Sequence, residues 1–166
     1  MKNVGFHGGH TVYEHGPAAD MIVFFQCIAL YGKNIQTDYD FSLLTDRLYR
    51  RYLRESELIP AMDLMSTVES LFCKIPSNTA NWIMMGVDFE LTKLDINQPT
   101  LNLVFVDYFH HFYEAKESAE SFLDIFKIYQ PVKIVITELP WFIEDKNRPL
   151  EQYDALGPDD PPFWLR

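Results

Sequence analysis

The chain has 166 residues, of which 48% are hydrophobic and 15% aromatic, and its formal net charge is −10. This composition excludes a disordered chain and favours one packed domain, residues 1–166. The negative charge argues against nucleic-acid binding, because phosphates require a basic surface. It suits either a strongly basic protein partner or plain solubility.

No segment of the sequence has the pattern of a membrane span or a secretion signal. The longest apolar run, residues 21–31, contains Gln26 and is shorter than the ~18 residues that span a bilayer. Lys2 is followed by polar residues and glycines instead of an apolar stretch with a cleavage site. We therefore expect a cytoplasmic protein without membrane contact, in which Cys27 and Cys73 are buried free thiols.

Residues 1–15 have the pattern of a β-hairpin, because Gly8 and Gly9 allow positive φ at both positions of a tight turn. The register that this turn implies pairs Val4 with Tyr13, Phe6 with Thr11 and His7 with His10. His7 and His10, with His15 close behind, are the nearest approach to a metal site. A firm zinc site needs three or four ligands, so we interpret these histidines as part of a solvated turn.

A helix is expected over residues 17–32, opened by Gly16 and Pro17 and closed by Gly32. Its acidic residue Asp20 lies near the positive end of the helix. Almost no polar face remains between these ends, which predicts burial on most sides. The polar segment 34–40 is expected to be a loop.

The stretch 41–75 predicts two antiparallel helices joined by a polar elbow at residues 54–57. Both halves carry apolar residues at helical spacing. The first half also carries a stripe of four arginines, Arg47, Arg50, Arg51 and Arg54. Such a stripe can grip a partner's phosphates or carboxylates, or it can pair with carboxylates of this chain. In so acidic a protein we favour the second interpretation.

Residues 82–91 alternate between apolar and polar positions, which predicts a strand with Asp88 and Glu90 on the face away from the core. A turn at 97–100 and a second antiparallel strand over 101–105 should follow. Helical spacing begins near Asp107, and the polar stretch 114–121 is compatible with one helix or with a break between two. The adjacent His110 and His111 are interpreted as packing or solvent contacts.

The run 132–137 is rich in β-branched residues and predicts a further strand. Residues 1–138 would then form the core, and residues 139–166 would form a tail in which prolines exclude regular structure over most of the length. This tail is too rich in aromatic residues to be free, so it should wrap and dock on the domain, or form part of a binding edge. The expected fold is α+β: an antiparallel sheet packed by the first helix and the central helical hairpin.

The sequence contains no Gly-rich phosphate loop, no GxSxG elbow, no HExxH and no paired CxxC. We therefore expect no enzyme, no cofactor and no metal. The alternative is a small enzyme or ligand-binding domain with a pocket between the sheet and the helices. Two close carboxylates or a histidine cluster in such a pocket would favour it.

Parts of the chain resemble bacterial immunity proteins. These parts are the two amphipathic segments 43–52 and 58–75, and the sequence Tyr-Gln-Pro-Val-Lys-Ile at 129–134, which leads into the proline- and aromatic-rich tail. These proteins neutralise polymorphic toxins, including those of contact-dependent growth inhibition. The resemblance covers less than half of the chain. It implies a one-to-one complex with a cognate toxin domain, often a basic nuclease, and in some members strand addition at a sheet edge.

An inhibitor of this kind would use acidic side chains to pair with the toxin's basic groups and aromatic side chains as buried anchors. On that basis the partner-binding candidates are Asp88, Glu90, Asp107, Tyr108, Glu138, Trp141, Glu144 and Asp145.

Overall fold

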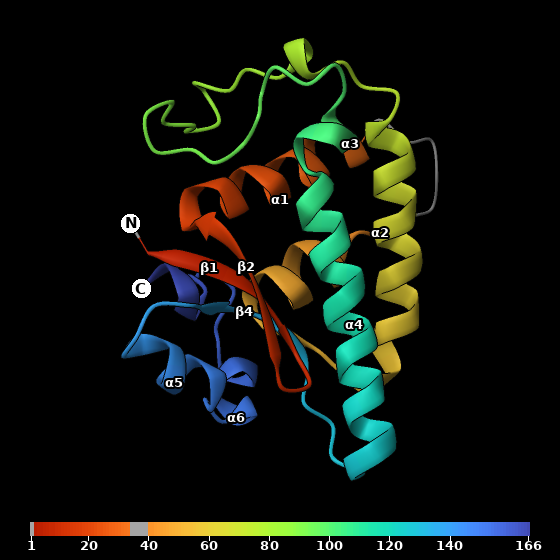
Figure 1. Cartoon of the computed structure of the whole chain (residues 1–166), viewed down its shortest axis with the longest axis vertical. Helices are drawn as coiled ribbons and strands as arrows, with labels where there is room; N and C mark the ends of the chain where they lie inside the picture. The colour runs from red at the N-terminus through yellow and green to blue at the C-terminus, as the bar shows by residue number, and fades with distance from the viewer. Residues whose placement is uncertain (1, 34–39) are drawn as a thin grey trace.

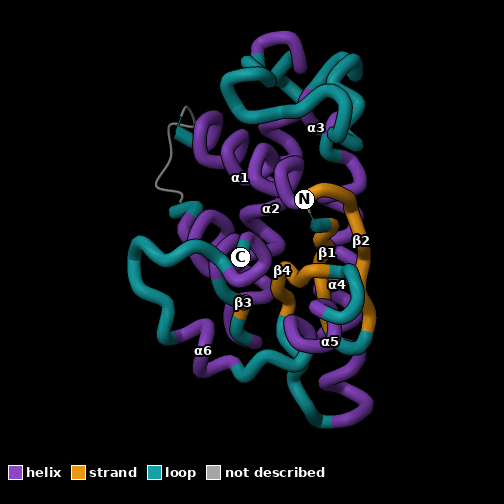
Figure 2. The backbone as a smooth tube through the Cα atoms, turned by 90° about the vertical axis from the view of Figure 1, so that its left-hand side faces the viewer, coloured by secondary structure: helices purple, strands orange, loops and turns teal. Residues whose placement is uncertain are grey.

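An antiparallel sheet of four strands, in the order β2–β1–β4–β3, lies at the centre of the part of the chain that the structure describes, residues 2–33 and 40–166. The structure is a computed structural model. The strands are β1 (Asn3–Gly8), β2 (Thr11–Pro17), β3 (Tyr52–Leu53) and β4 (Val132–Ile136). Figure 2 shows them in this order, from β3 to β2. The predicted α+β class is confirmed. The predicted polar loop lies outside the described residues except for Asp40.

The hairpin β1–β2 is confirmed, but its predicted register is wrong. Gly8 pairs with Thr11, so the turn residues are Gly9 and His10, and only Gly9 has a positive φ, of 63°. Gly8 belongs to the strand because it lies against the helix α4 (Val106–Phe126), where an added Cβ would approach the carbonyl oxygen of Ala115 to 2.1 Å. The glycine pair therefore serves close packing as well as the turn. His7 consequently faces Val12 instead of His10.

Helix α1 (Ala18–Gly32) matches the predicted helix and is buried along most of its length. Its Phe24 ring lies at the centre of an aromatic cluster, 5.2 Å from Phe105 and 5.4 Å from Phe109 between ring centroids. Cys27 is buried as predicted. Cys73 is exposed instead, because it caps the C-terminus of α2 (Leu58–Phe72) and points away from the core.

The second half of the predicted helical hairpin is confirmed as α2, whereas the first half is helical over residues 42–50 but ends before Tyr52. A short π-helix, η1 (Leu43–Leu48), is followed within four residues by β3, and a 3-10 turn, η2 (Glu55–Glu57), leads into α2. Tyr52 and Leu53 leave the helix because they pair with Lys133 and Val132 of β4 and extend the sheet by one strand. Periodicity alone could not reveal this, since the partner strand lies about 80 residues further along the chain.

Both strands predicted between residues 82 and 105 are wrong. Residues 80–100 form an irregular loop after a 3-10 turn, η3 (Ser77–Thr79), and α3 (Leu101–Val104) stands where the second strand was expected. Gly86 has a φ of 86°, which interrupts an extended conformation in the middle of the first predicted strand. The helix predicted near Asp107 is confirmed as α4, which is one helix through residues 114–121.

Helices cover both faces of the sheet (Figure 1). On one face, Phe6 of β1 packs against Phe112 of α4. On the other, Lys133 of β4 donates hydrogen bonds to carbonyl oxygens of α5 (Trp141–Lys146). The tail continues through α6 (Leu150–Asp154) and the 3-10 turn η4 (Phe163–Leu165), so it contains more regular structure than its prolines suggested. It docks as predicted, with Tyr153 and Trp164 buried.

Candidate functional site

The loop of residues 80–100, which we call the anchored loop, is fixed to the body of the protein by buried side chains. Trp82, Val87 and Leu94 are each no more than 8% exposed, and the Trp82 ring packs 6.3 Å from that of Phe105. At the base of the loop, the amide N–H of Ser77 donates to the carbonyl oxygen of Pro99 over 3.1 Å. The loop is therefore attached to the body of the protein at both ends and in its middle.

Asp20 of α1 provides a further attachment for the anchored loop. Its Oδ1 accepts a hydrogen bond from the hydroxyl of Thr92 at 2.9 Å, and its Oδ2 accepts one from the amide of Lys93 at 2.7 Å. Burial raises the pKa of this carboxyl above its ordinary value, while these hydrogen bonds and the charge of Lys93 act in the opposite direction. Asp20 is thus a structural acceptor whose two oxygens are both occupied.

The anchored loop also exposes large apolar side chains. The exposed fractions are 72% for Ile83, 81% for Met84, 53% for Phe89 and 60% for Leu91. Single exposed apolar residues are common, but four on one loop make that loop a candidate interaction site. Ile83 and Phe89 line one hollow of the loop, and Leu91 lines another. The acidic candidates Asp88 and Glu90 lie between them and are exposed. They line a groove of about 380 Å³ that also includes Asn3, Pro17, Ala19, Asp20, Gly86, Leu91, Thr92 and Lys93.

A second apolar surface surrounds the start of α5. Leu139 is 69% exposed, Trp141 44% and Ile143 59%. The Nζ of Lys2 lies 4.3 Å from the centre of the Trp141 ring, in a cation–π geometry. Oε1 of Glu138 accepts a hydrogen bond from the amide of Asn3 at 3.0 Å.

The α5 surface and the anchored loop adjoin the same strand end. A cleft of about 350 Å³ beside α5 includes Lys2 and Glu144, and the groove of the anchored loop includes the next residue, Asn3. In Figure 1 the N-terminus accordingly lies between the loop and α5. Five candidates predicted from the sequence are thereby brought to one side of the molecule: Asp88, Glu90, Glu138, Trp141 and Glu144.

Two of the predicted partner contacts are buried, which corrects their assignment. Tyr108 is 5% exposed because its ring stacks on that of His15 at 4.2 Å between centroids. Asp145 is 2% exposed; its Oδ2 accepts a hydrogen bond from the amide of Ile136 at 2.8 Å, and its Oδ1 lies 3.0 Å from a guanidinium nitrogen of Arg148. Asp107 is exposed in the first turn of α4 but lines neither the groove nor the cleft.

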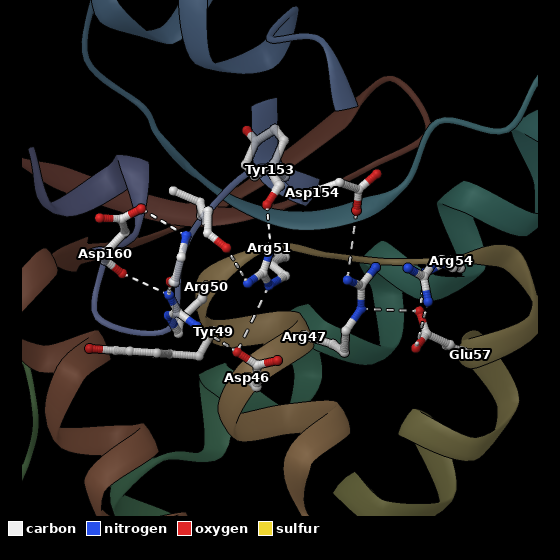
Figure 3. A network of polar contacts seen from close by, with 12 residues as sticks. Asp46, Arg47, Tyr49, Arg50, Arg51, Arg54, Glu57, Tyr153, Asp154 and Asp160 are labelled. Atoms are coloured by element: carbon white, nitrogen blue, oxygen red, sulfur yellow. Dashed lines mark hydrogen bonds and ion pairs between the residues drawn. The ribbon is translucent and has the colours of Figure 1, made fainter. Parts of the chain in front are cut away.

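The arginine stripe holds the tail against η1 and β3, as Figure 3 shows. Arg51 donates to the carbonyl oxygens of Tyr153 at 2.5 Å and Leu156 at 2.7 Å. Arg50 donates to the carbonyl oxygens of Gly157 and Asp160, the latter at 2.9 Å. Main-chain carbonyls of the tail are therefore major acceptors for this stripe.

Carboxylates of this chain complete the network. Arg50 pairs with Asp46 at 2.9 Å, and Arg47 lies 3.5 Å from Glu57 and 3.8 Å from Asp154. Arg54 is 56% exposed and pairs with Glu57 at 4.0 Å. The interpretation that the arginine stripe pairs with carboxylates of this chain is confirmed. The stripe also holds the tail against the rest of the domain.

The interpretation of the histidines as part of a solvated turn is wrong for His7, which is 1% exposed on β1. His15 and His111 approach to 3.0 Å between their Nδ1 atoms, across β2 and α4. Burial lowers the pKa of His15 to about 3, and burial together with the charge of Lys133 lowers that of His7 to about 4. Among the described residues, no group of three or more histidine, cysteine, aspartate or glutamate side chains is arranged to hold a metal ion.

The face between the sheet and α5 is filled by Lys133, whose Nζ donates to the carbonyl oxygens of Asp145 at 3.1 Å and Lys146 at 3.2 Å. Burial lowers the pKa of this amine to about 8. The Lys133 Nζ also lies 5.0 Å from the centre of the Tyr153 ring. These contacts attach the tail helices to the sheet.

Sequence reasoning did not assign the exposed residues Ile83, Met84 and Leu91 to a binding surface. Their alternation with polar residues indicated a half-buried strand, and no pattern within the segment distinguishes that strand from an anchored loop. No helix in residues 2–33 and 40–166 is long and apolar enough to cross a membrane. No family model, curated protein or solved structure matches this chain.

Proposed function

We propose that the protein is a non-enzymatic inhibitor that binds a basic toxin domain of bacterial origin and blocks its active site or substrate surface. The observation that carries this proposal is the anchored loop, which exposes four large apolar side chains and places one of them, Leu91, in the same groove as the carboxylates of Asp88 and Glu90. Apolar anchors surrounded by charge are the usual composition of a specific protein interface.

The attachments of the anchored loop support tight binding. A loop backbone already held in place loses little conformational entropy on association, so more of the contact energy is realised as affinity. Two such attachments flank Phe89 along the loop. The buried Trp82 precedes it, and the hydrogen bond to Asp20 follows it. The surface around Trp141 adjoins the loop through Lys2 and Asn3 and extends the proposed interface.

The charge of the chain supports a basic partner. With a net charge of −10, the protein would attract a cationic toxin and repel acidic proteins, which raises the association rate and the selectivity. A nuclease is the toxin class that fits this charge best, because its substrate surface must be basic. The resemblance to immunity proteins points to the same class of partner.

The alternative, a ligand-binding or catalytic pocket, is less well supported. The groove beside Asp88 and Glu90 does approach the first turn of α1. Its most buried carboxylate, Asp20, already accepts hydrogen bonds from Thr92 and Lys93. A general acid or base would need that carboxyl to be available to a substrate.

The test is a pull-down with the product of the adjacent upstream gene, followed by a rescue assay in cells that express that product. Wild-type protein is expected to bind and protect, and the double variant Phe89→Ser/Leu91→Ser to lose both. The matched control is Leu30→Ser, which changes an apolar residue that is 48% exposed at the end of α1. Failure of the wild-type protein to bind or protect would overturn the proposal.

A further inference from the structure

A second surface with apolar and acidic side chains lies between the start of α2 and the last turns of α4. This α2–α4 groove has a volume of about 270 Å³ and is lined by Glu55, Leu58, Ile59, Glu120, Leu123 and Asp124. In Figure 1 the end of α4 is at the opposite end of the molecule from the anchored loop. The α2–α4 groove is therefore separate from the interface proposed above.

The floor and the surroundings of the α2–α4 groove are apolar. Leu58 and Leu123 lie in its lining, and Ile59 is 62% exposed at its edge. Beyond it, the C-terminal end of α4 exposes Ile125 by 69% and Phe126 by 56%. Large aliphatic and aromatic side chains at this exposure are favourable sites for burial by a partner.

Carboxylates stand on both walls of the α2–α4 groove. Glu55 belongs to the α2 side, and Glu120 and Asp124 belong to α4. Glu120 pairs with Lys116 at 2.8 Å, whereas the carboxylates of Glu55 and Asp124 have no ion-pair partner within residues 2–33 and 40–166. An occupant must therefore be apolar along its centre and cationic along both flanks.

We propose that the α2–α4 groove binds an amphipathic helix of a partner protein, with an apolar stripe facing Ile59 and Leu123 and with lysine or arginine on both flanks. A helix has this arrangement because its apolar stripe is bordered on each side by polar positions. A second copy of this chain would bring the same carboxylates and a charge of −10 to the contact, so like-charge repulsion opposes it.

The test uses a fluorescein-labelled peptide of about 15 residues with leucines at helical spacing and lysines elsewhere, a length sufficient for a marginal helix. Fluorescence anisotropy is measured at about 0.15 M salt, where diffuse attraction is screened beyond about 8 Å. Saturable binding to the wild-type protein is expected. A peptide with glutamate in place of lysine should not bind.

Two variants that each remove three carboxylates distinguish attraction of the peptide to the α2–α4 groove from attraction to the overall negative charge of the protein. Glu55→Gln/Glu120→Gln/Asp124→Asn is expected to weaken peptide binding by about tenfold or more. The matched control, Glu14→Gln/Asp107→Asn/Glu151→Gln, removes three exposed carboxylates outside both proposed surfaces, has the same net charge and should change the dissociation constant by less than about threefold. Thermal unfolding of both variants establishes that each remains folded.

The location of binding is tested by amide chemical shifts, which should change at residues 55–59 and 120–128 on addition of the lysine peptide. Equal weakening by the two charge variants, shift changes centred on the anchored loop, or no saturable binding would each overturn the proposal.

Sedimentation tests the competing occupant. A dimer that dissociates in Ile59→Glu would assign the α2–α4 groove to a second copy of the chain.

Discussion

The hydroxyl of Thr92 donates a hydrogen bond of 2.9 Å to Oδ1 of Asp20, which joins the anchored loop to the first turn of α1. The two residues are 72 positions apart in the sequence. The amide of the next residue, Lys93, donates to the other oxygen of the same carboxylate. One buried carboxylate thereby fixes the position of a loop whose outer face carries the proposed binding residues.

Asp20→Ala should loosen the anchored loop. The substitution leaves the hydroxyl of Thr92 and the amide of Lys93 without their acceptor, and we expect a loss of about 1–3 kcal/mol in the free energy of unfolding. Urea denaturation measures that loss, and amide hydrogen exchange should become faster over residues 83–93. Asp63→Asn, at an exposed site of α2, is the control. Unchanged exchange in the loop would contradict the anchoring role.

Trp82→Ala and Phe89→Ser should separate stability from binding within the same loop. Trp82 is 8% exposed and packs against Phe105, so its truncation should cost about 3–5 kcal/mol of unfolding free energy. Phe89 is 53% exposed, so its replacement should change stability by about 0.5 kcal/mol or less while weakening capture of the toxin. Thermal unfolding and pull-down measure the two effects. A large loss of stability in Phe89→Ser would place that ring in the core.

Arg51→Met should release part of the tail. Its guanidinium donates to two carbonyl oxygens of the tail and is 13% exposed, so we expect a loss of about 2–4 kcal/mol in unfolding free energy. Arg54→Met is the matched control, because Arg54 is 56% exposed and should contribute about 0.5 kcal/mol or less.

Charge reversal at Arg47 and Arg51 tests the other role considered for the stripe. Lower folding stability with toxin binding intact is expected if these side chains only clamp the tail. Loss of binding in a variant that remains fully folded would instead assign them to the interface.

Acid should destabilise the protein through its buried histidines. The pKa of His7 is about 4 in the folded state, whereas an imidazole in the unfolded chain titrates near 6.5. As the pH falls from about 6.5 towards 4, the unfolded state binds the proton first, so stability present above pH 6.5 is progressively lost. At pH 5 the expected loss from His7 is about 2 kcal/mol. His15, whose pKa is about 3, contributes in the same direction.

Urea denaturation at pH 7 and pH 5 measures this effect. His7→Leu should reduce the difference between the two pH values, whereas His110→Gln, at an exposed position of α4, should leave it unchanged. An equal pH dependence in wild type and His7→Leu would show that His7 is not the group responsible.

The two thiols should differ in reactivity. Cys73 is exposed and should react readily with an aromatic disulfide reagent in the native state. Cys27 is fully buried, and burial raises its pKa to about 12, so its reaction should be more than about 100-fold slower and should follow unfolding. Cys73→Ser, which retains only Cys27, isolates the slow phase. Rapid labelling of that variant would contradict the burial of Cys27.

The helices that sequence analysis located correctly are those whose pattern is local and long. The apolar run of α1 and the helical spacing of α2 and α4 are determined within each segment, since an amphipathic or wholly apolar helix buries its face whatever its exact neighbours. The β-branched run of β4 was equally clear. The candidates Asp88, Glu90 and Trp141 were also placed on exposed surface, as expected for charged or amphipathic side chains.

The errors arose where a distant segment determines the local structure. Leu53 follows helical spacing but pairs with Val132, and Met84 belongs to an alternating pattern but lies on a loop that is not a strand of the sheet. Tyr108 and Asp145 have the composition of surface contacts, yet each is buried by a partner from another element: His15 for Tyr108 and the amide of Ile136 for Asp145.

The sequence by itself determined the α+β class, the helices with long periodic patterns and the acidic character of the surface, because these depend on composition and on neighbours a few residues apart. Only the tertiary structure decided that residues 80–100 are a loop held by Asp20 and Trp82. It also decided that the arginines clamp the tail. Both outcomes depend on hydrogen bonds and packing between residues far apart in the chain, for which local periodicity carries no signal.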